Sequence, residues 1–432
     1  MFVEFSVTNY RSFAEKQTLS LVAGGSAKKQ PCFAFTSGNS FAPDLLRSAC
    51  IFGANGSGKT ALVKAMDFFK DFVISSSKNS QEGEPIGVEP NVFRTGLAER
   101  PSTFEIVFVH QETLYQYGFA VDQQRVWSEW LFARPNKDKS RTRGLFQREF
   151  DATEQNYSWD INHTHIKGQK ELWKKSTRDN SLFLSQAVQL NAEDLKTPFS
   201  WIQDNFGVIK SANGLPYNFT ARQCDGKDKK TEILELLQSV DIRIQDINIE
   251  KKEVNFNLSS IPFVDKVFPK EFLENFRKEK FPKLEIKLSH QQESGSLIPL
   301  HIDEESKGTQ VLFGLAGLWL EVLERGYTLV IDELHNHMHP HALRILINLF
   351  HNPVINKNRA QLIFTSHETS VMAKGFMHQD QIWLTEKSTY ESTRLVPLSD
   401  FKVRDLHNFQ KAYLHGRYGG VPNIRETLFH GK

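Results

Sequence analysis

The segment G-A-N-G-S-G-K-T, from Gly53 to Thr60, fits the pattern G-x-x-x-x-G-K-[ST] at every fixed position. A short apolar run, Ala49 to Phe52, precedes it, and apolar residues with helical spacing follow from Ala61 to Phe72. The sequence therefore predicts the strand, loop and helix of a phosphate-binding loop (P-loop). Glycines let the backbone turn tightly and approach phosphate oxygens, and the start of the helix directs free N–H groups toward them.

This P-loop predicts a nucleotide site with defined contacts. The Lys59 side chain is expected to reach the β- and γ-phosphates of ATP, and the Thr60 hydroxyl is expected to bind Mg²⁺. The other loop residues expected to contact the nucleotide are Asn55, Gly56, Ser57 and Gly58.

The composition fits a folded chain of more than one lobe. The 432 residues are 39% hydrophobic and include 34 Phe, which is enough for a substantial core. The net charge of +2 gives no global argument for a permanently bound nucleic acid. Three cysteines without C-x-x-C spacing argue against a disulfide framework. Because no signal-peptide pattern or long apolar run occurs, we expect a cytoplasmic protein without membrane contact.

The N-terminus alternates apolar and polar residues from Phe2 to Val7, which predicts a half-buried strand before Asn9-Tyr10-Arg11-Ser12-Phe13. A strand followed by N-[FY]-R-S-F about forty residues before a P-loop resembles the start of the SMC/RecF branch of ABC ATPases. The resemblance implies that Arg11 contacts the nucleotide. The residues alone fit a surface arginine after a strand equally well.

The middle of the chain predicts an antiparallel β lobe and a compact insert. Val73 to Ser102 is polar and turn-rich, which predicts an exposed loop, and alternation from Thr103 to Phe150 predicts a meander. Gln169 to Phe206 has helical spacing, whereas Ser211 to Lys230 predicts a loop. Phe263 to Phe281 fits either an amphipathic helix or an extended segment. No heptad pattern occurs, so no long coiled coil is expected.

Two features of this middle region remain open. The resemblance implies a glutamine that binds Mg²⁺, for which Gln186 and Gln189 are equal candidates. Two basic clusters, Lys137 to Arg143 and Lys227 to Lys230, fit either solvated loops or contacts with nucleic-acid phosphates.

The C-terminal part carries the motifs that complete an ATPase. The apolar run Thr328 to Ile331 ends in Asp332 and Glu333, which is typical of a Walker B strand buried on both faces. Asp332 is expected to hold Mg²⁺, and Glu333 is expected to polarise the attacking water. A second strand, Gln361 to Thr365, leads to Ser366-His367 and resembles the switch histidine of ABC ATPases, which implies that His367 contacts the γ-phosphate.

A helix that begins near Ser306 and Gly308 resembles the ABC signature, although Glu305, Lys307 and Thr309 depart from the usual residues. The same residues alone would fit an N-capped helix. The resemblance implies that Ser306 and Gly308 bind the γ-phosphate of a nucleotide held by a second copy. ATP would then lie between two head-to-tail copies.

Two further segments have less definite interpretations. His335 to His341 has alternating histidines, but it occupies the place of the D-loop, and a short exposed loop seldom supplies a four-ligand metal cage. Tyr413 to Asn423 resembles a tail of compact ABC ATPases, and Arg417 within it is a candidate contact for a partner or a nucleotide.

The predicted fold class is α/β. It is an ABC-ATPase head, a P-loop NTPase with a mixed sheet and an antiparallel β lobe, with a compact, mainly helical insert. The expected domains are residues 1–165 (P-loop and β lobe), 166–300 (insert) and 301–432 (signature, Walker B, D-loop and switch histidine).

The chain resembles compact SMC/RecF/OLD-like ATPases of anti-phage operons, such as those of the Septu, PARIS, AbiL and retron-associated systems. This resemblance implies an ATP-driven sensor or scaffold that controls a separate effector nuclease of the HNH or TOPRIM kind. The alternative is a RecF-like ATPase that binds DNA during repair, for which the basic clusters are the support.

Overall fold

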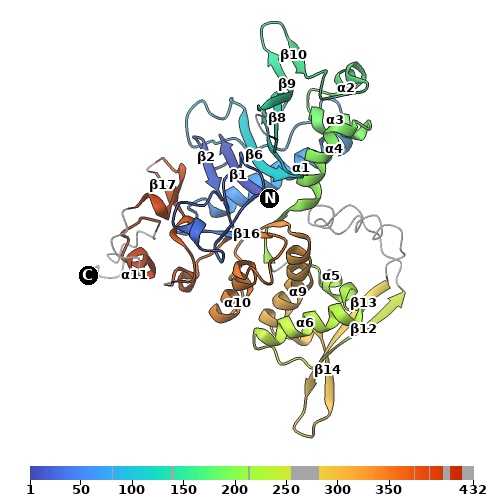
Figure 1. The fold of residues 1–432 in the computed structure, drawn as a ribbon, viewed down its shortest axis with the longest axis vertical. Coiled ribbons are helices and arrows are strands. Elements are labelled where there is room, and N and C mark those ends of the chain that lie inside the picture. Colours follow the sequence, from blue (N-terminus) through green and yellow to red (C-terminus); the bar gives the residue numbers. More distant parts are fainter. Residues whose placement is uncertain are drawn as a thin grey trace, which may run out of the picture.

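The computed structural model describes residues 1–79, 81–137, 141–212, 215–253, 282–373, 375–388, 390–401 and 409–420. These residues form a six-stranded sheet, a seven-stranded sheet and two smaller sheets, with helices packed between and around them (Figure 1). The mixed α/β architecture is that of a P-loop ATPase head, as the motifs predict.

The central sheet has the strand order β11-β15-β16-β5-β17-β18, and every neighbouring pair is parallel except β17 and β18. In that order the strands span Phe206–Ile209, Thr328–Ile331, Gln361–Thr365, Ser48–Gly53, Ile382–Lys387 and Thr393–Pro397. Ile51 packs into the cluster on one face, whereas Cys50 and Phe52 pack into the cluster on the other face. Burial on both faces explains why these strands read as continuous apolar runs.

The second large sheet is antiparallel and has the order β10-β9-β8-β7-β6-β1-β2. Its strands span Asn156–Ile161, Arg143–Asp151, Val126–Pro135, Thr113–Val121, Ser102–His110, Phe2–Thr8 and Gln17–Ser20. The predicted meander is therefore confirmed, and the N-terminal strand β1 joins it beside β6.

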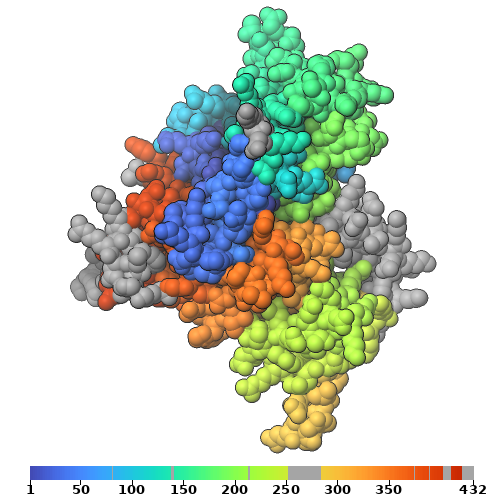
Figure 2. All heavy atoms as spheres, in the orientation of Figure 1, coloured from blue at the N-terminus to red at the C-terminus, as the bar shows by residue number. Residues whose placement is uncertain are grey.

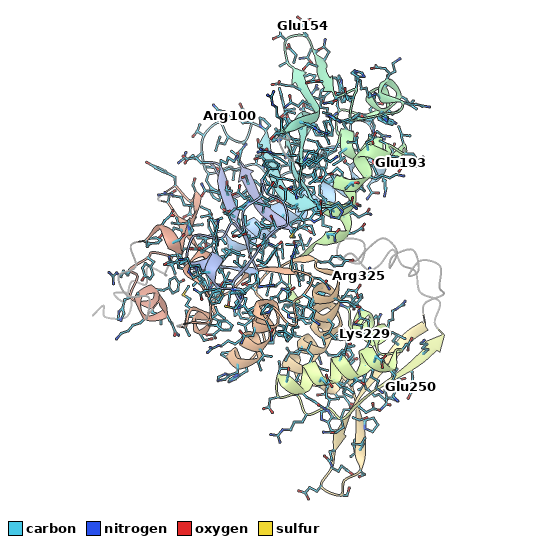
Figure 3. The ribbon with its side chains drawn as sticks, in the orientation of Figure 1. Arg100, Glu154, Glu193, Lys229, Glu250 and Arg325 are labelled. Atoms are coloured by element: carbon cyan, nitrogen blue, oxygen red, sulfur yellow. The ribbon has the colours of Figure 1, made fainter. Side chains whose placement is uncertain are left out.

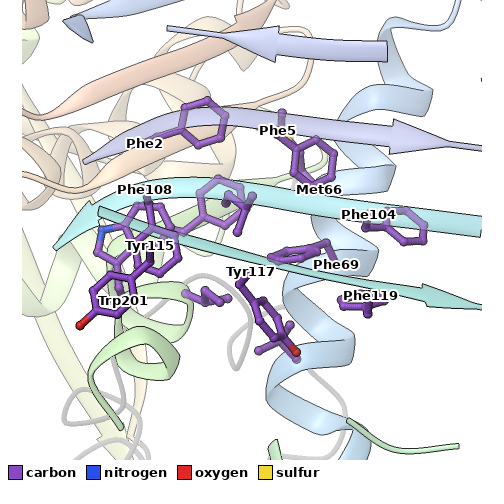
Figure 4. Close-up of a cluster of buried hydrophobic side chains, with 14 of the residues drawn as sticks. Phe2, Phe5, Met66, Phe69, Phe104, Phe108, Tyr115, Tyr117, Phe119 and Trp201 are labelled. Carbon is purple, nitrogen blue, oxygen red and sulfur yellow. The ribbon is translucent and has the colours of Figure 1, made fainter. Parts of the chain in front are cut away.

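Aromatic side chains hold helix α1, Lys59–Asn79, against this antiparallel sheet (Figure 4). The Phe69 ring stacks on Phe119 with centroids 5.3 Å apart, and it meets Phe5 edge to face at 5.7 Å. All three side chains are fully buried. Large aromatic surfaces of this kind bury much apolar area and favour offset or edge contacts, so they fix α1 between the two large sheets.

Helix α1 continues past Phe72 to Asn79, so the loop predicted from Val73 is wrong over its first residues. Two serines of this polar run, Ser76 and Ser77, are buried and hydrogen-bonded. Ser76 Oγ accepts from the backbone N–H of Leu182 at 3.2 Å, and Ser77 Oγ lies 2.8 Å from Ser185 Oγ. A polar run can therefore stay helical when a neighbouring segment satisfies its hydroxyls.

The insert is mainly helical in its described part. Its helical segments are α2 Lys170–Ser176, α3 Phe183–Gln189, α4 Glu193–Ser200, the π-helical turn Trp201–Asn205, α5 Tyr217–Gln223 and α6 Lys227–Ser239. The longest described helix of the chain, α1, has 21 residues, so no long coiled coil occurs in the described part.

The loop predicted from Ser211 to Lys230 is wrong, because α5 and the start of α6 lie there. Helix α5 packs closely on α9, Lys307–Arg325. A Cβ at Gly317 would lie only 2.8 Å from the Thr220 Cα, and the Thr220 hydroxyl accepts from the Gly317 N–H at 3.1 Å. This glycine-to-threonine contact lies between segments far apart in sequence, so local composition gave no sign of it.

A three-stranded sheet, β12 Asp246–Glu253, β13 Pro282–Gln291 and β14 Leu297–His301, leads into the signature segment, and its β13–β14 hairpin projects from the body (Figures 1 and 2). The segment Phe263 to Phe281 lies outside the described residues. Strand β11 lies within 166–300 in sequence but in the central sheet in space, so residues 166–300 do not all lie apart from the ATPase sheet. No described helix is both long and apolar enough to cross a membrane.

A buried ion pair joins the β lobe to α3. Arg148 Nε lies 3.0 Å from Glu129 Oε2, and both side chains are fully buried. The Glu129 carboxylate also accepts from the backbone N–H groups of Phe183 and Leu184 at 2.6 and 3.0 Å, at the first turn of α3. One buried carboxylate thus caps a helix and neutralises a buried guanidinium.

We predict that Glu129→Gln lowers the free energy of unfolding by about 3–5 kcal/mol, because it leaves the Arg148 charge buried without a counter-ion. Urea unfolding followed by circular dichroism measures this change. Glu149→Gln is the matched control, because Glu149 is exposed on the same strand as Arg148. Equal stability of the two variants would contradict a stabilising role for the ion pair.

Candidate nucleotide-binding site

The P-loop is held in shape by two threonines of the C-terminal strands β17 and β18. A Cβ at Gly53 would lie 2.1 Å from Thr385 Oγ1, and one at Gly58 would lie 2.2 Å from Thr393 Oγ1. The Thr385 hydroxyl is 2.6 Å from the Ser57 hydroxyl, and the Thr393 hydroxyl is 2.9 Å from the Ser57 carbonyl oxygen. These close approaches require glycine at both positions. The Ser57 side chain points toward Thr385 of β17.

The Lys59 ammonium lies inside the P-loop, where it is expected to bind phosphates. Its Nζ donates to the carbonyl oxygens of Gly53 and Ala54 at 2.8 and 2.9 Å, and the residue is only 6% exposed. Burial lowers the pKa of Lys59 to about 8, although the nearby charges of Asp332 and Glu333 act in the opposite direction. A phosphate oxygen would replace the two carbonyl acceptors and favour the charged amine.

A single hydroxyl binds both Walker B residues. Thr365 Oγ1, at the end of β16, donates to Asp332 Oδ1 at 2.5 Å and accepts from the Glu333 N–H at 2.8 Å. The Asn336 amide donates to Glu333 Oε2 at 2.6 Å. Asp332 is 4% exposed, whereas the Glu333 side chain lines an open cavity. No sequence motif assigned a role to Thr365. The only signal for it is its position directly before Ser366-His367.

Two histidine rings meet beside these carboxylates. The ring of His367 lies edge to face with that of His335, with centroids 5.6 Å apart. Burial lowers the pKa of both histidines, and the Lys59 charge lowers that of His367 further, so both rings are neutral at pH 7. A neutral ring can donate one hydrogen bond to a phosphate oxygen through its protonated nitrogen.

The expected nucleotide contacts meet in one cavity of about 990 Å³. The predicted residues that line it are Arg11, Asn55, Gly56, Gly58, Lys59, Thr60, Glu333 and His367. Gly56 has a positive φ of 74° and open space where a Cβ would be, so the backbone there can approach a ligand. A cationic amine, a helix N-terminus, a hydroxyl and carboxylates in one cavity are the groups that Mg²⁺ and ATP need.

The N-Y-R-S-F segment holds the loop of residues 88–101 at this cavity. Asn9 Nδ2 donates to two backbone carbonyls of the loop at 2.8 Å, and Asn91 Nδ2 donates to the Arg11 carbonyl at 2.7 Å. The Arg11 guanidinium forms an ion pair with Glu89, with Nη2 and Oε1 2.6 Å apart. Arg11 is therefore placed at the cavity wall and not simply on the surface.

The signature segment lies elsewhere. Of the described residues that line the cavity, none comes from Ser306 to Thr309. Ser306 is exposed and caps α9, since its hydroxyl accepts from the Thr309 N–H at 3.1 Å. Gly308 approaches the D-loop so closely that a Cβ would lie 2.7 Å from the His337 carbonyl oxygen. This N-cap faces solvent and is free to meet a second molecule.

The structure contradicts both glutamine candidates for Mg²⁺. Gln186 and Gln189 lie on α3, which contacts the C-terminal part of α1 through Ser77 and Ser185. At about 1.5 Å of rise per residue, Ser77 is roughly 27 Å along α1 from Lys59. The glutamines that line the cavity are instead Gln123 and Gln124, in the turn between β7 and β8. That turn is remote from the P-loop in sequence, so only the fold reveals it.

One D-loop histidine, His339, has a local structural role. The His339 side chain accepts from the His341 N–H at 3.2 Å and caps α10, Pro340–His351, whose first residue is proline. Among the described residues, no group of three or more His, Cys, Asp or Glu side chains is arranged to hold a metal ion.

The C-terminal tail supports the back of the P-loop strand. The Tyr413 ring packs against Phe52 with centroids 6.1 Å apart, and its hydroxyl donates to the Gly420 carbonyl at 3.0 Å. A Cβ at Gly420 would lie 3.8 Å from the Gly53 Cα. Arg417 is exposed and outside the walls of the cavity, so its predicted contact with a nucleotide receives no support within one chain.

We predict that nucleotide binding takes up protons. Because the pKa of Lys59 is about 8 in the free site, nucleotide phosphates raise it, and affinity is full below pH 8 and falls above it. Calorimetry at pH 8 in buffers of different ionisation enthalpy should show about half a proton taken up per nucleotide. Lys59→Arg, which stays charged, should abolish the uptake. Equal uptake in both proteins would contradict this origin.

Comparison with known proteins places these motifs in a family. Residues 48–373 match the family described as "AAA domain, putative AbiEii toxin, Type IV TA system". A search of curated proteins finds no match.

Two solved structures are similar over almost the whole chain. One is the Smc head domain with an extended coiled coil from Pyrococcus furiosus, solved with the C-terminal domain of ScpA. It has 10% identity and a TM-score of 0.37, and the match covers 92% of this chain and 97% of that one. The other is the recombination mediator protein RecF of the RecFOR pathway, with 12% identity, a TM-score of 0.30, and coverage of 91% and 98%.

The family match includes the P-loop, the signature segment, the Walker B strand and His367. It covers most of the 432 residues, and it spans the P-loop, Glu333 and His367, which line a single cavity. The chain therefore belongs to this family of AAA domains, and its motifs are those of an ATPase.

Proposed function

We propose that this protein hydrolyses ATP between two copies of the chain and uses the cycle to hold and release a separate partner protein. One observation carries the proposal: Lys59, Glu333 and His367 line one cavity, whereas Ser306 and Gly308 lie outside it and Ser306 is exposed. A second copy can supply the signature residues, and ATP would then lie between two head-to-tail copies.

Within one chain, the residues have distinct roles in this proposal. The Lys59 ammonium and the loop residues Asn55 to Gly58 bind the β- and γ-phosphates, and Arg11 adds a cation at the wall. Thr60 and Asp332 would hold Mg²⁺, which neutralises the charge that develops on the phosphates.

The hydrolytic step relies on groups that the fold already positions. Thr365 and Asn336 fix the Glu333 carboxylate at the cavity, where it can accept a proton from the attacking water. The neutral ring of His367 can donate a hydrogen bond to the γ-phosphate while the negative charge on that phosphate changes during hydrolysis. The partner's signature helix would add the Ser306 hydroxyl and backbone N–H groups at the opposite side.

The family description supports a two-component system. It names a putative toxin of a type IV toxin–antitoxin system, and a toxin–antitoxin system has two components. We propose that the partner here is an effector nuclease of the HNH or TOPRIM kind in an anti-phage system, held by one nucleotide state and released by the other. An ATP-dependent dimer provides the two states that such a switch requires.

The alternative function is DNA binding in repair. Its sequence support includes the cluster Lys227 to Lys230 at the start of α6, where Figure 3 labels Lys229. Two of these cations form ion pairs within the chain. Lys229 lies 2.7 Å from Glu324, and Lys230 lies 2.6 Å from Asp246. Cations held by carboxylates release fewer counter-ions from DNA, so this observation favours the partner-protein proposal.

We predict that Glu333→Gln forms a stable dimer in the presence of ATP and Mg²⁺. The amide cannot accept the proton of the attacking water, so the sandwiched state should persist. Light scattering of the purified variant with and without ATP measures it. The double variant Glu333→Gln, Lys59→Ala should remain monomeric, and a monomer of the single variant at saturating ATP would contradict the dimer.

The same variant tests the partner, after co-expression with the neighbouring open reading frame. Native mass spectrometry should show a complex with the second protein whose stability depends on ATP. The repair function would be supported instead if the variant formed only a dimer without the second protein, and if ATP hydrolysis by the wild-type protein needed DNA and fell steeply with salt.

A further inference from the structure

The cavity has walls beyond the phosphate site, and these walls differ from it in chemical character. The P-loop, Glu333 and His367 line the cavity, as described above. The loop of residues 88–101 and the turn Asp122 to Gln124 between β7 and β8 also line it. A ligand that contacts both sets of residues must carry phosphates and a second, different group.

The loop of residues 88–101 is built as a rigid platform. Asn91 is fully buried, and its side-chain oxygen accepts from the backbone N–H groups of Phe93 and Arg94 at 3.1 and 3.0 Å. Asn9 is 2% exposed and binds both Asn91 and the far end of the loop. Two buried amides thus fix the backbone on either side of Phe93.

This platform presents apolar side chains to the cavity. Phe93 and Val92 line it, yet they are 54% and 72% exposed. Exposed apolar side chains on a rigid segment of a pocket are suited to cover the flat face of a ligand. A phenyl ring stacks on any nucleobase, because every base has a π-face.

The turn between β7 and β8 supplies polar groups to the cavity. The Asp122 carboxylate is used within the turn, where it accepts from the backbone N–H groups of Gln124 and Arg125 at 2.7 and 2.8 Å. Gln123 and Gln124 are exposed at the same wall, and their amides carry the donors and acceptors that match the edge of a base.

The cation of the P-loop decides where the phosphates bind. Lys59 and the start of α1 attract them. Glu89 and Glu99, on the loop that carries Phe93, line the cavity, but Arg11, which is paired with Glu89, and Arg100 line it as well and balance these carboxylates. With its phosphates held at the P-loop, a nucleotide has its flat, uncharged base available for the apolar side chains of the loop.

We propose that the loop of residues 88–101 is the nucleobase-binding wall of the site, with Phe93 stacking on the base of ATP and the glutamines at its edge. This inference rests on the proposed ATP site and extends it to the base. It assigns Phe93 a role in affinity and specificity that no sequence motif indicated.

The test compares ATP with inorganic tripolyphosphate, which has the phosphates but no base. Calorimetry should show that Phe93→Ala weakens ATP binding by about tenfold and leaves tripolyphosphate binding unchanged. Phe93→Tyr, which keeps the ring, should restore ATP affinity. Val92→Ala should weaken ATP binding less, and Val354→Ala is the matched control, because Val354 is 71% exposed and outside the cavity walls.

The outcomes test the nucleobase wall separately from the proposed ATP site. Equal ATP affinity of Phe93→Ala and the wild type, or equal weakening of ATP and tripolyphosphate, overturns the base wall but leaves the phosphate site intact. Wild-type protein that binds tripolyphosphate as tightly as ATP also overturns it. Wild-type protein that binds neither ligand overturns the proposed ATP site itself.

Discussion

The position of β5 between β16 and β17 is the constraint on which the site depends. The P-loop leaves the end of β5, and both hydrogen-bonded neighbours of that strand come from the last quarter of the chain. Parallel strands in this order bring the P-loop, Thr365 and the Walker B carboxylates to one edge of the sheet. The cavity can therefore form only after the two ends of the chain have paired.

Hydroxyl groups then fix the geometry at that edge. Thr385 and Thr393 hold the P-loop through hydrogen bonds to Ser57, and Thr365 binds both Walker B residues. Short side chains with one donor and two acceptor positions can join backbone and carboxylate groups within a tight space. This half-site is rigid, and the exposed N-terminal cap of α9 lies outside it, so we expect the moving part of the cycle to lie between two copies.

The motifs with local chemistry could be predicted from sequence. The P-loop, the Walker B pair and His367 each follow a strand with a fixed pattern. The structure places the P-loop, Glu333 and His367 around one cavity, and the buried Asp332 is hydrogen-bonded to Thr365. Features set by distant packing could not be predicted in the same way. Helix α1 continues through buried serines, and Gln186 lies far from the site because α3 packs on the end of α1. Phe93 belongs to a polar, turn-rich stretch, and only its anchoring by Asn9 and Asn91 shows that it faces the cavity.

The most direct test of the shared site mixes two inactive variants. Lys59→Ala removes the P-loop cation, and Ser306→Arg blocks the exposed signature helix, so each homodimer lacks a complete site. We predict that neither variant hydrolyses ATP alone and that their mixture regains activity, because a mixed dimer pairs one intact P-loop with one intact signature. Mixed dimers without activity, or wild-type hydrolysis by Ser306→Arg alone, would contradict an ATP site built from two chains.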